Sequence, residues 1–235
     1  MILEIVVETV EDAIAAENGG ADQIEVKCDY LEYGLTPTAG MLEQVCNNTS
    51  CNVLCMVRPH ARSYVNSKAD LAAMASDIKQ ASSLPIKGFL LGCLTSQGDL
   101  DIAALKYLKE AAGSLALHFH LAWELTPNPY DTLDQLIELG FTSVRTSGGG
   151  GISGSVGKNL AKIRDFVKHT KGDLNFFLAG GITIENVTQI VSKTGIDRVH
   201  SGSGVREPSI RTGVVSEDKV RAMKQAMIRA KFIQN

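Results

Sequence analysis

Residues 175–206 read NFFLAGGITIENVTQIVSKTGIDRVHSGSGVR, and this stretch decides the fold. An apolar run, 176–179, stops at the glycine pair 180–181, where the backbone can turn sharply and expose N–H groups. A periodic, helix-like segment follows. It leads into a second short apolar run, 196–200, which stops at Ser-Gly-Ser-Gly, residues 201–204. Two successive strand ends therefore carry glycine loops.

The two glycine loops predict an anion-binding site. Adjacent groups of backbone N–H donors suit a phosphate or another small anion. In an eight-stranded β/α barrel, the loops after strands seven and eight usually hold such a site. The candidate residues in these loops are Gly180, Gly181, Gly202, Ser203 and Gly204. This match sets the strand register for the whole chain.

A third glycine-rich loop, 146–151, follows the expected sixth strand and adds Ser147 and Gly148 to the anion-binding candidates. This loop either folds over a ligand or is only a mobile connection. Four aromatic residues also fall in loops after strands, where they either line a pocket or cover the rim at an oligomer contact. They are Tyr30, Tyr33, Tyr64 and Trp123.

Outward from this stretch, short β-rich runs alternate with helix-like segments along the chain. The expected strands are residues 2–7, 23–28, 53–58, 87–94, 115–120, 142–146, 176–179 and 196–200. The expected helices are residues 11–19, a segment starting at 36–38, 70–82, 101–112, 130–140, 156–171, 186–195 and 216–232. A repeat of about 29 residues suits a compact (β/α)8 TIM barrel. We therefore expect residues 1–235 to form one TIM-barrel domain.

A doubly wound open sheet is the alternative fold. It requires a GxGxxG turn after the first strand, and residues 9–12, Thr-Val-Glu-Asp, stand there instead. Composition also fits one large core, with 44% hydrophobic residues in a chain of 235. Residues and spacing thus favour the barrel.

Charge and cysteine content exclude several classes of partner. The net charge is −3 with both signs interspersed, so we expect no nucleic-acid binding. The N-terminus has no basic region before its short apolar run, and no stretch approaches the roughly 20 apolar residues that span a bilayer. Five cysteines, an odd number, fit reduced thiols better than a disulfide framework. We expect a cytoplasmic protein that binds no membrane.

Strand alternation predicts which polar side chains enter the barrel mouth. Where the apolar residues of a strand face the helices, the intervening polar residues face the interior. The inward candidates are Glu4, Glu25, Lys27, Arg58, His118, His120 and His200, with Arg145 near them. Each has a purely structural alternative, because a buried carboxylate can simply pair with a neighbouring cation. Their number favours catalysis at the mouth, where barrel enzymes hold their chemistry.

Two patterns raise the question of metal binding. His118-Phe119-His120 is an H-x-H sequence that can place two imidazoles on one metal ion. Cys28, Cys51 and Cys55 are thiols, which suit Cu(I), and we keep Cys28 and Cys55 as weak metal candidates. Free cysteines usually only pack in the core. No C-x-x-C, Gly-x-Ser-x-Gly or Walker-type sequence is present, which disfavours covalent serine chemistry and nucleotide hydrolysis.

Ordered motifs along nearly the whole chain resemble the CutC family, named for copper homeostasis. They are GADQIEV with YGLTPTAGML, MVRP, GFLLGCLTSQGDLD, HFHLAW with NPYDTLDQLIELGF, RTSGG, FLAGGITIEN and TGIDRVHSGS. The resemblance implies a single cytosolic (β/α)8 barrel, often dimeric. It also implies five residues at the mouth, namely Glu4, Glu25, Arg58, His120 and His200.

The chain departs from the family pattern at three places. Residues 60–63, His-Ala-Arg-Ser, stand where the family usually has Arg-Gly-Gly-Asp, and residues 121–124, Leu-Ala-Trp-Glu, stand where it has Arg-Ala-Phe-Asp. Lys27 takes the position of a family cysteine, and Cys28 is displaced by one residue. These changes indicate a divergent member and weigh against a thiol copper site.

Three functions remain open at this point. The first is a CutC-like role in copper homeostasis, with Cu(I) bound directly or no cofactor at all. The second is an isomerase, epimerase or lyase that acts on a small phosphorylated metabolite at the mouth. There Glu25 with His120 moves protons, while Lys27 or Arg58 neutralises developing charge. The third is an inactive barrel used as an interaction module. The expected partners are a small anion or a copper ion, and a second copy of the chain in a homodimer.

Overall fold

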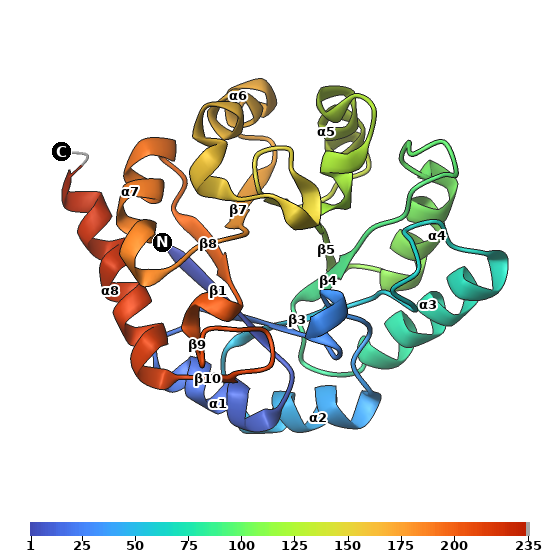
Figure 1. The fold of residues 1–235 in the computed structure, drawn as a ribbon. Coiled ribbons are helices and arrows are strands. Elements are labelled where there is room, and N and C mark those ends of the chain that lie inside the picture. The colour runs from blue at the N-terminus through green and yellow to red at the C-terminus, as the bar shows by residue number, and fades with distance from the viewer. Residues whose placement is uncertain (234–235) are drawn as a thin grey trace.

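The computed structural model describes residues 1–233 and contains eight parallel strands closed into a barrel, with the helices around it (Figure 1). Each strand pairs with the next along the chain, and β8 pairs with β1. The strands are β1 (Ile2–Val7), β2 (Gln23–Val26), β3 (Asn52–Met56), β4 (Gly88–Leu91), β5 (Ala116–Phe119), β6 (Ser143–Thr146), β7 (Asn175–Ala179) and β8 (Arg198–Ser201). The predicted TIM-barrel fold class is confirmed.

The helices alternate with the strands as predicted. They are α1 (Val10–Asn18), α2 (Ala39–Asn48), α3 (Lys68–Ala81), α4 (Ile102–Ala112), α5 (Pro129–Glu138), α6 (Leu160–Thr170), α7 (Ile184–Thr194) and α8 (Glu217–Ile233). Short 3-10 helices occupy some loops, namely η1 (Tyr30–Glu32), η2 (Leu121–Leu125), η3 (Gly151–Ser153), η4 (Val156–Lys158) and η5 (Ser203–Val205). Among residues 1–233, no helix combines the length and apolar character needed to cross a membrane.

Local sequence explains where several helices begin and end. At the start of α3 the Ser67 hydroxyl accepts a hydrogen bond from the Asp70 N–H, and the Asp70 carboxylate accepts one from the Ser67 N–H. This reciprocal arrangement satisfies donors that the first turn of a helix leaves free. At the other end of a helix, Gly195 adopts φ +74° and terminates α7.

Helix α6 and the last loop differ from the sequence prediction. The predicted helix 156–171 is divided into η4 and α6, because the Asn159 side chain between them donates to the backbone carbonyls of Ser147 and Ser155. After β8 the chain also forms a two-stranded hairpin, β9 (Arg206–Glu207) with β10 (Val214–Val215), which hydrophobic periodicity did not predict.

Strand alternation places the apolar core between the barrel and the helices. On β1, Leu3, Ile5 and Val7 are fully buried in this layer. Glu4 therefore faces the barrel interior, where it is paired in register with His200 of β8. The fold thus turns the polar residues of the strands toward the barrel axis.

Trp123 does not line a pocket or a rim. It is fully buried, its ring packs edge-on against Phe166, and its Nε1–H donates to the Arg145 carbonyl over 2.7 Å. The indole lies outside the barrel wall because η2 turns back over β6. The loop position of this residue in the sequence was thus a poor guide to its exposure.

Candidate functional site

A cavity of about 390 Å³ opens at the end of the barrel where the strands finish. Five of the predicted side chains line it, namely Glu25, Lys27, Arg58, His120 and His200. Lys27 and His120 directly follow β2 and β5, and Arg58 lies two residues after the end of β3, so the cavity is at the carboxyl ends of the strands. This is the face on which TIM-barrel enzymes build their active sites.

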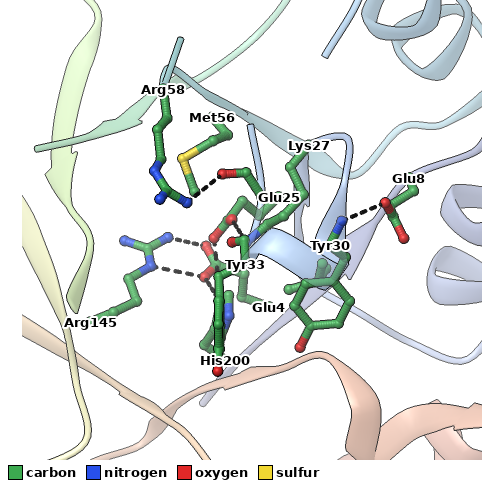
Figure 2. Close-up of polar contacts among 12 residues, drawn as sticks. Glu4, Glu8, Glu25, Lys27, Tyr30, Tyr33, Met56, Arg58, Arg145 and His200 are labelled. Atoms are coloured by element: carbon green, nitrogen blue, oxygen red, sulfur yellow. Dashed lines mark hydrogen bonds and ion pairs between the residues drawn. The ribbon is translucent and has the colours of Figure 1, made fainter. Parts of the chain in front are cut away.

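Glu4 lies fully buried beneath this cavity and anchors a charged cluster (Figure 2). Arg145 Nε donates to Glu4 Oε1 over 3.0 Å, and a second guanidinium nitrogen of Arg145 contacts Oε2. His200 Nδ1 lies 2.7 Å from Oε1, and Gln23 donates to Oε2. Burial by itself would raise the pKa of Glu4, but Arg145 and His200 outweigh it and hold the pKa well below its usual range. Glu4 is therefore ionised.

Glu25 and Lys27 form a second ion pair on the same interior face. Glu25 lies in register with Val6, two residues closer than Glu4 to the carboxyl ends of the strands. His200 links the two pairs, because its Nδ1 lies 3.5 Å from Glu25 Oε2 as well as close to Glu4. Lys27 also donates to the Tyr33 carbonyl over 3.3 Å. Figure 2 shows the two carboxylates, His200 and the cations converging on one region.

Arg58 makes contacts that strand alternation alone does not predict. Its guanidinium donates to the backbone carbonyls of Glu32, Gly34 and Ala61 over 2.7, 3.2 and 3.2 Å. These bonds hold the segment containing η1 against β3. Among the described residues its Nε has no hydrogen-bond partner. Arg58 thus uses most of its donors to build one wall of the cavity.

His120 is buried at the cavity wall as a neutral imidazole. Burial, with Arg58 and Lys27 nearby, lowers its pKa from 6.5 to about 3. The Ala122 N–H donates to Nδ1 over 3.3 Å, so we assign the proton to Nε2. Within residues 1–233, Nε2 has no hydrogen-bond partner. The ring fits there because residue 92 is glycine, since a Cβ at Gly92 would collide with it.

His118 faces the barrel interior but is separated from the cavity lining. Its Nδ1 lies 2.7 Å from Ser143 Oγ, which also accepts a hydrogen bond from Arg145 over 3.1 Å. Burial and the Arg145 charge lower the pKa of His118 to about 3. His118 therefore stays neutral and contacts Ser143 rather than a ligand of the cavity.

The glycine loops after β7 and β8 line the cavity with backbone. Gly180 and Gly181 have φ values of +108° and +67°, which side chains on L-residues disfavour. Gly202, Ser203 and Gly204 follow β8, and a Cβ on Gly202 would collide with the Tyr30 hydroxyl. The N–H groups of Gly181, Ser203 and Gly204 donate to no acceptor within the part of the chain that the structure describes.

Ser147 and Gly148, the candidates in the third glycine loop, bind a carboxylate of the chain itself. Glu124 Oε1 accepts from the N–H groups of Ser147 and Gly148 over 2.9 and 3.0 Å. Its Oε2 accepts from the Ser147 hydroxyl and the Gly151 N–H over 2.5 and 2.8 Å. Glu124 is 5% exposed, so it fills the anion-binding loop from inside. This departs from the expected external anion. Glu124 stands in the segment 121–124 that departs from the family pattern, but that difference did not indicate its contact with the loop.

Aromatic and basic side chains complete the outer part of the cavity. Tyr30, Tyr33 and Tyr64 line it, consistent with one of the two roles expected for them. Arg145 and Arg211 line it as well. No motif or periodicity marks Arg211, which lies in an irregular segment between β9 and β10.

One set of potential metal ligands exists among the described residues. Donor atoms of Glu4, Glu25 and His200 all lie within 4.8 Å of one another. Two carboxylates and an imidazole suit a hard or borderline divalent ion better than Cu(I). Both carboxylates already pair with Arg145 and Lys27, which a metal ion would have to displace.

The two candidate thiols do not line the cavity. Cys28 Sγ donates to the Thr36 carbonyl over 3.1 Å, and Cys55 is buried in the layer between the barrel and the helices. Burial raises the pKa of both thiols, most strongly that of Cys55. Since Cu(I) binds thiolate, these surroundings work against a copper site at either residue.

Comparisons with known proteins identify relatives along most of the chain. A model described as the CutC family matches residues 1–205. A CutC family protein of Treponema denticola is 35% identical over 211 residues, covering 89% of this chain and 85% of the relative. A CutC family protein of Proteus mirabilis is 33% identical, with 96% of each chain covered.

Solved structures give the same result. A CutC protein of Streptococcus agalactiae, whose name refers to copper homeostasis, has a TM-score of 0.81 at 27% identity, covering 86% of this chain and 98% of that one. A thiamine phosphate pyrophosphorylase of Pyrococcus furiosus has a TM-score of 0.64 at 14% identity, covering 97% of this chain and 96% of that one. The second likeness shows the fold alone.

Proposed function

The chain belongs to the CutC family, and from this premise we propose that it acts in copper homeostasis as an enzyme on a small phosphorylated metabolite. The copper role follows from the name of the Streptococcus agalactiae relative. The chemistry follows from the cavity at the barrel mouth. We place the reaction there, in the cytoplasm, and assign the thiols no role in it.

The observation that carries this proposal is the charge of the mouth. Four cations, Lys27, Arg58, Arg145 and Arg211, line the cavity. Two carboxylates, Glu4 and Glu25, pair with them. The excess of positive charge favours an anionic ligand. Unpartnered N–H groups in the loops after β7 and β8 supply the usual phosphate position of a TIM barrel.

The side chains next to this position suit proton transfer beside a carbonyl group. His120 lines the cavity as a neutral imidazole and its buried Nε2–H has no partner among the described residues, so we assign this donor to a developing enolate oxygen. Glu25 is the carboxylate that lines the cavity and can accept a proton from carbon. Lys27 and His200 contact Glu25 and stabilise the charge changes that accompany the transfer. Isomerases and epimerases that act through an enolate use this set of roles.

Thermal unfolding tests the proposal with inorganic phosphate, a panel of sugar phosphates and, separately, Cu(I) under reducing conditions. A ligand at about one hundred times its dissociation constant adds roughly 2.7 kcal/mol to native stability. We expect a phosphate ester to raise the midpoint, and we expect Cys28→Ser and Cys55→Ser to leave that rise unchanged. A midpoint raised by copper alone, and lost in the cysteine variants, would contradict the proposal.

Glu25→Gln tests the catalytic role directly once an ester has been identified. We expect the variant to bind the ester and to lose its conversion. Glu32→Gln is the matched control, because the Glu32 side chain lies exposed on η1. Full conversion by Glu25→Gln would remove Glu25 from the mechanism.

A further inference from the structure

Arg211 differs from the other cations of the cavity because its charge is uncommitted. Lys27 and Arg145 pair with carboxylates, and Arg58 donates to backbone carbonyls. The Arg211 guanidinium has no ion pair and no hydrogen bond within residues 1–233. It lines the cavity, so its donors are available to a ligand.

Aromatic rings hold this guanidinium in place. Its Cζ lies 3.7 Å from the centroid of the Tyr33 ring and 5.9 Å from that of Tyr30, as in cation–π contacts. Tyr33 has φ +68°, an unfavourable value for a residue other than glycine. The bonds from Arg58 to the carbonyls of Glu32 and Gly34 fix the backbone on both sides of it. The strained loop is therefore a rigid platform for Arg211.

The hairpin that carries Arg211 is anchored at its base. Arg206 is 1% exposed and donates to Asp12 over 3.1 Å and to the carbonyls of Gly213 and Val6 over 2.5 and 3.1 Å. Asp12 in turn accepts from the Val215 N–H over 2.8 Å. Both strands of the hairpin are thus tied to α1 and β1, while the loop with Arg211 projects over the mouth.

Tyr30 connects Arg211 with the glycine loop after β8. Its hydroxyl lies against the backbone of Gly202, and its ring lies near the Arg211 guanidinium. The unpartnered N–H groups of Ser203 and Gly204 follow in the same loop. Uncommitted side-chain and backbone donors are therefore gathered at one side of the cavity.

We propose that Arg211 completes a phosphate-binding site with the N–H groups of Gly181, Ser203 and Gly204 and thereby determines specificity for phosphate esters. Three N–H groups and two guanidinium donors make five donors, and the three oxygens of a terminal phosphate have enough lone pairs to accept from all of them. A carboxylate, with about four lone-pair sites, leaves donors unpaired. Arg211 also lies beyond residues 1–205, so this specificity comes from outside the part that the family model matches. The inference rests on the proposed function, which supplies the phosphorylated ligand.

Isothermal titration of the full chain with inorganic phosphate, and with acetate as the carboxylate probe, tests this inference. A charged hydrogen-bonding partner changes affinity by about tenfold to a hundredfold. We expect Arg211→Ala to weaken phosphate binding by that factor and Arg211→Lys to weaken it less. Arg229→Ala, which removes an exposed arginine on α8, is the matched control and should bind like the unmodified chain. Arg211→Ala should lower its unfolding midpoint only slightly, because the contacts of the guanidinium among the described residues are cation–π contacts with Tyr33 and Tyr30 and no hydrogen bond or ion pair.

The outcomes separate this inference from the proposed function. Unchanged phosphate affinity in Arg211→Ala overturns the role of Arg211 and leaves the phosphate-dependent enzyme standing. Acetate binding tighter than phosphate binding overturns the specificity for phosphate. If neither phosphate nor any ester of the panel binds to the unmodified chain, the proposed function is overturned, and the inference with it.

Discussion

Replacement of His120 by glutamine should change how the stability of this protein depends on pH. In the folded chain the pKa of His120 is about 3, lowered from 6.5 by burial and by two nearby cations. Between these values the unfolded chain binds a proton at this residue and the folded chain does not. Above pH 6.5 His120 is neutral in both states and does not reduce the free energy of unfolding. As the pH falls from 6.5 toward 3, the unfolded chain gains a proton there and the free energy of unfolding decreases.

The size of the effect follows from linkage. One proton taken up on unfolding costs about 1.4 kcal/mol per pH unit. Between pH 5.5 and 4.5 the unfolded chain is almost fully protonated at this site, so His120 alone contributes about 1.4 kcal/mol to the loss. His118, with its pKa lowered to about 3 in the same way, contributes a similar amount.

Urea unfolding at pH 7.5, 5.5, 5.0 and 4.5 measures this slope. We expect His120→Gln to reduce the slope between pH 5.5 and 4.5 by about 1.4 kcal/mol per pH unit relative to the unmodified chain. His169→Gln removes a histidine that pairs with Asp134 at the surface, and so controls for loss of any histidine. An identical slope in His120→Gln and the unmodified chain would refute the buried neutral state.

Three further predictions concern other buried groups. Glu4→Gln should lower the free energy of unfolding by about 3 to 5 kcal/mol in urea titration, since it leaves the Arg145 charge buried without a partner. A loss below about 1 kcal/mol would contradict this. Glu124→Ala should speed hydrogen exchange at the Ser147 and Gly151 amides, which lose their acceptor, and unchanged protection at both would contradict the role of Glu124. Cys55→Ser should leave Cu(I) affinity unchanged in a competition titration, because burial keeps this thiol protonated. Loss of one bound equivalent of Cu(I) in the variant would instead support a copper site at Cys55.

The sequence was sufficient for the barrel and for the residues that face its interior. Apolar residues at every second position of β1 and β2 can face only the helix layer, so Glu4 and Glu25 had to turn inward. The sequence allows each buried carboxylate to pair with a neighbouring cation, and the structure pairs Glu25 with Lys27 but Glu4 with Arg145, which is far away in the sequence. The alternation of inward and outward side chains depends only on neighbouring residues of one strand, so it can be predicted from the sequence of a single chain.

Contacts between segments far apart in the chain could not be predicted from the sequence. Glu124 fills the loop at Ser147 and Gly148 because η2 turns back toward β6, and no local pattern announces that turn. The Arg58 guanidinium donates hydrogen bonds to the carbonyls of a loop that precedes it by more than twenty residues. Arg211 reaches the cavity only because a hairpin is tied to the opposite end of the chain. Each depends on tertiary structure rather than on spacing.

The proposed phosphate site is tested most directly by proton–nitrogen NMR of the full chain during titration with inorganic phosphate at constant ionic strength. We expect the amide protons of Gly181, Ser203 and Gly204 to shift downfield together as they gain a charged acceptor. The Gly148 and Gly151 amides, already bound to Glu124, should stay in place. Saturable shifts at the first three amides are the predicted result. Unchanged positions there, or shifts confined to other surfaces of the barrel, would contradict an anion site at its mouth.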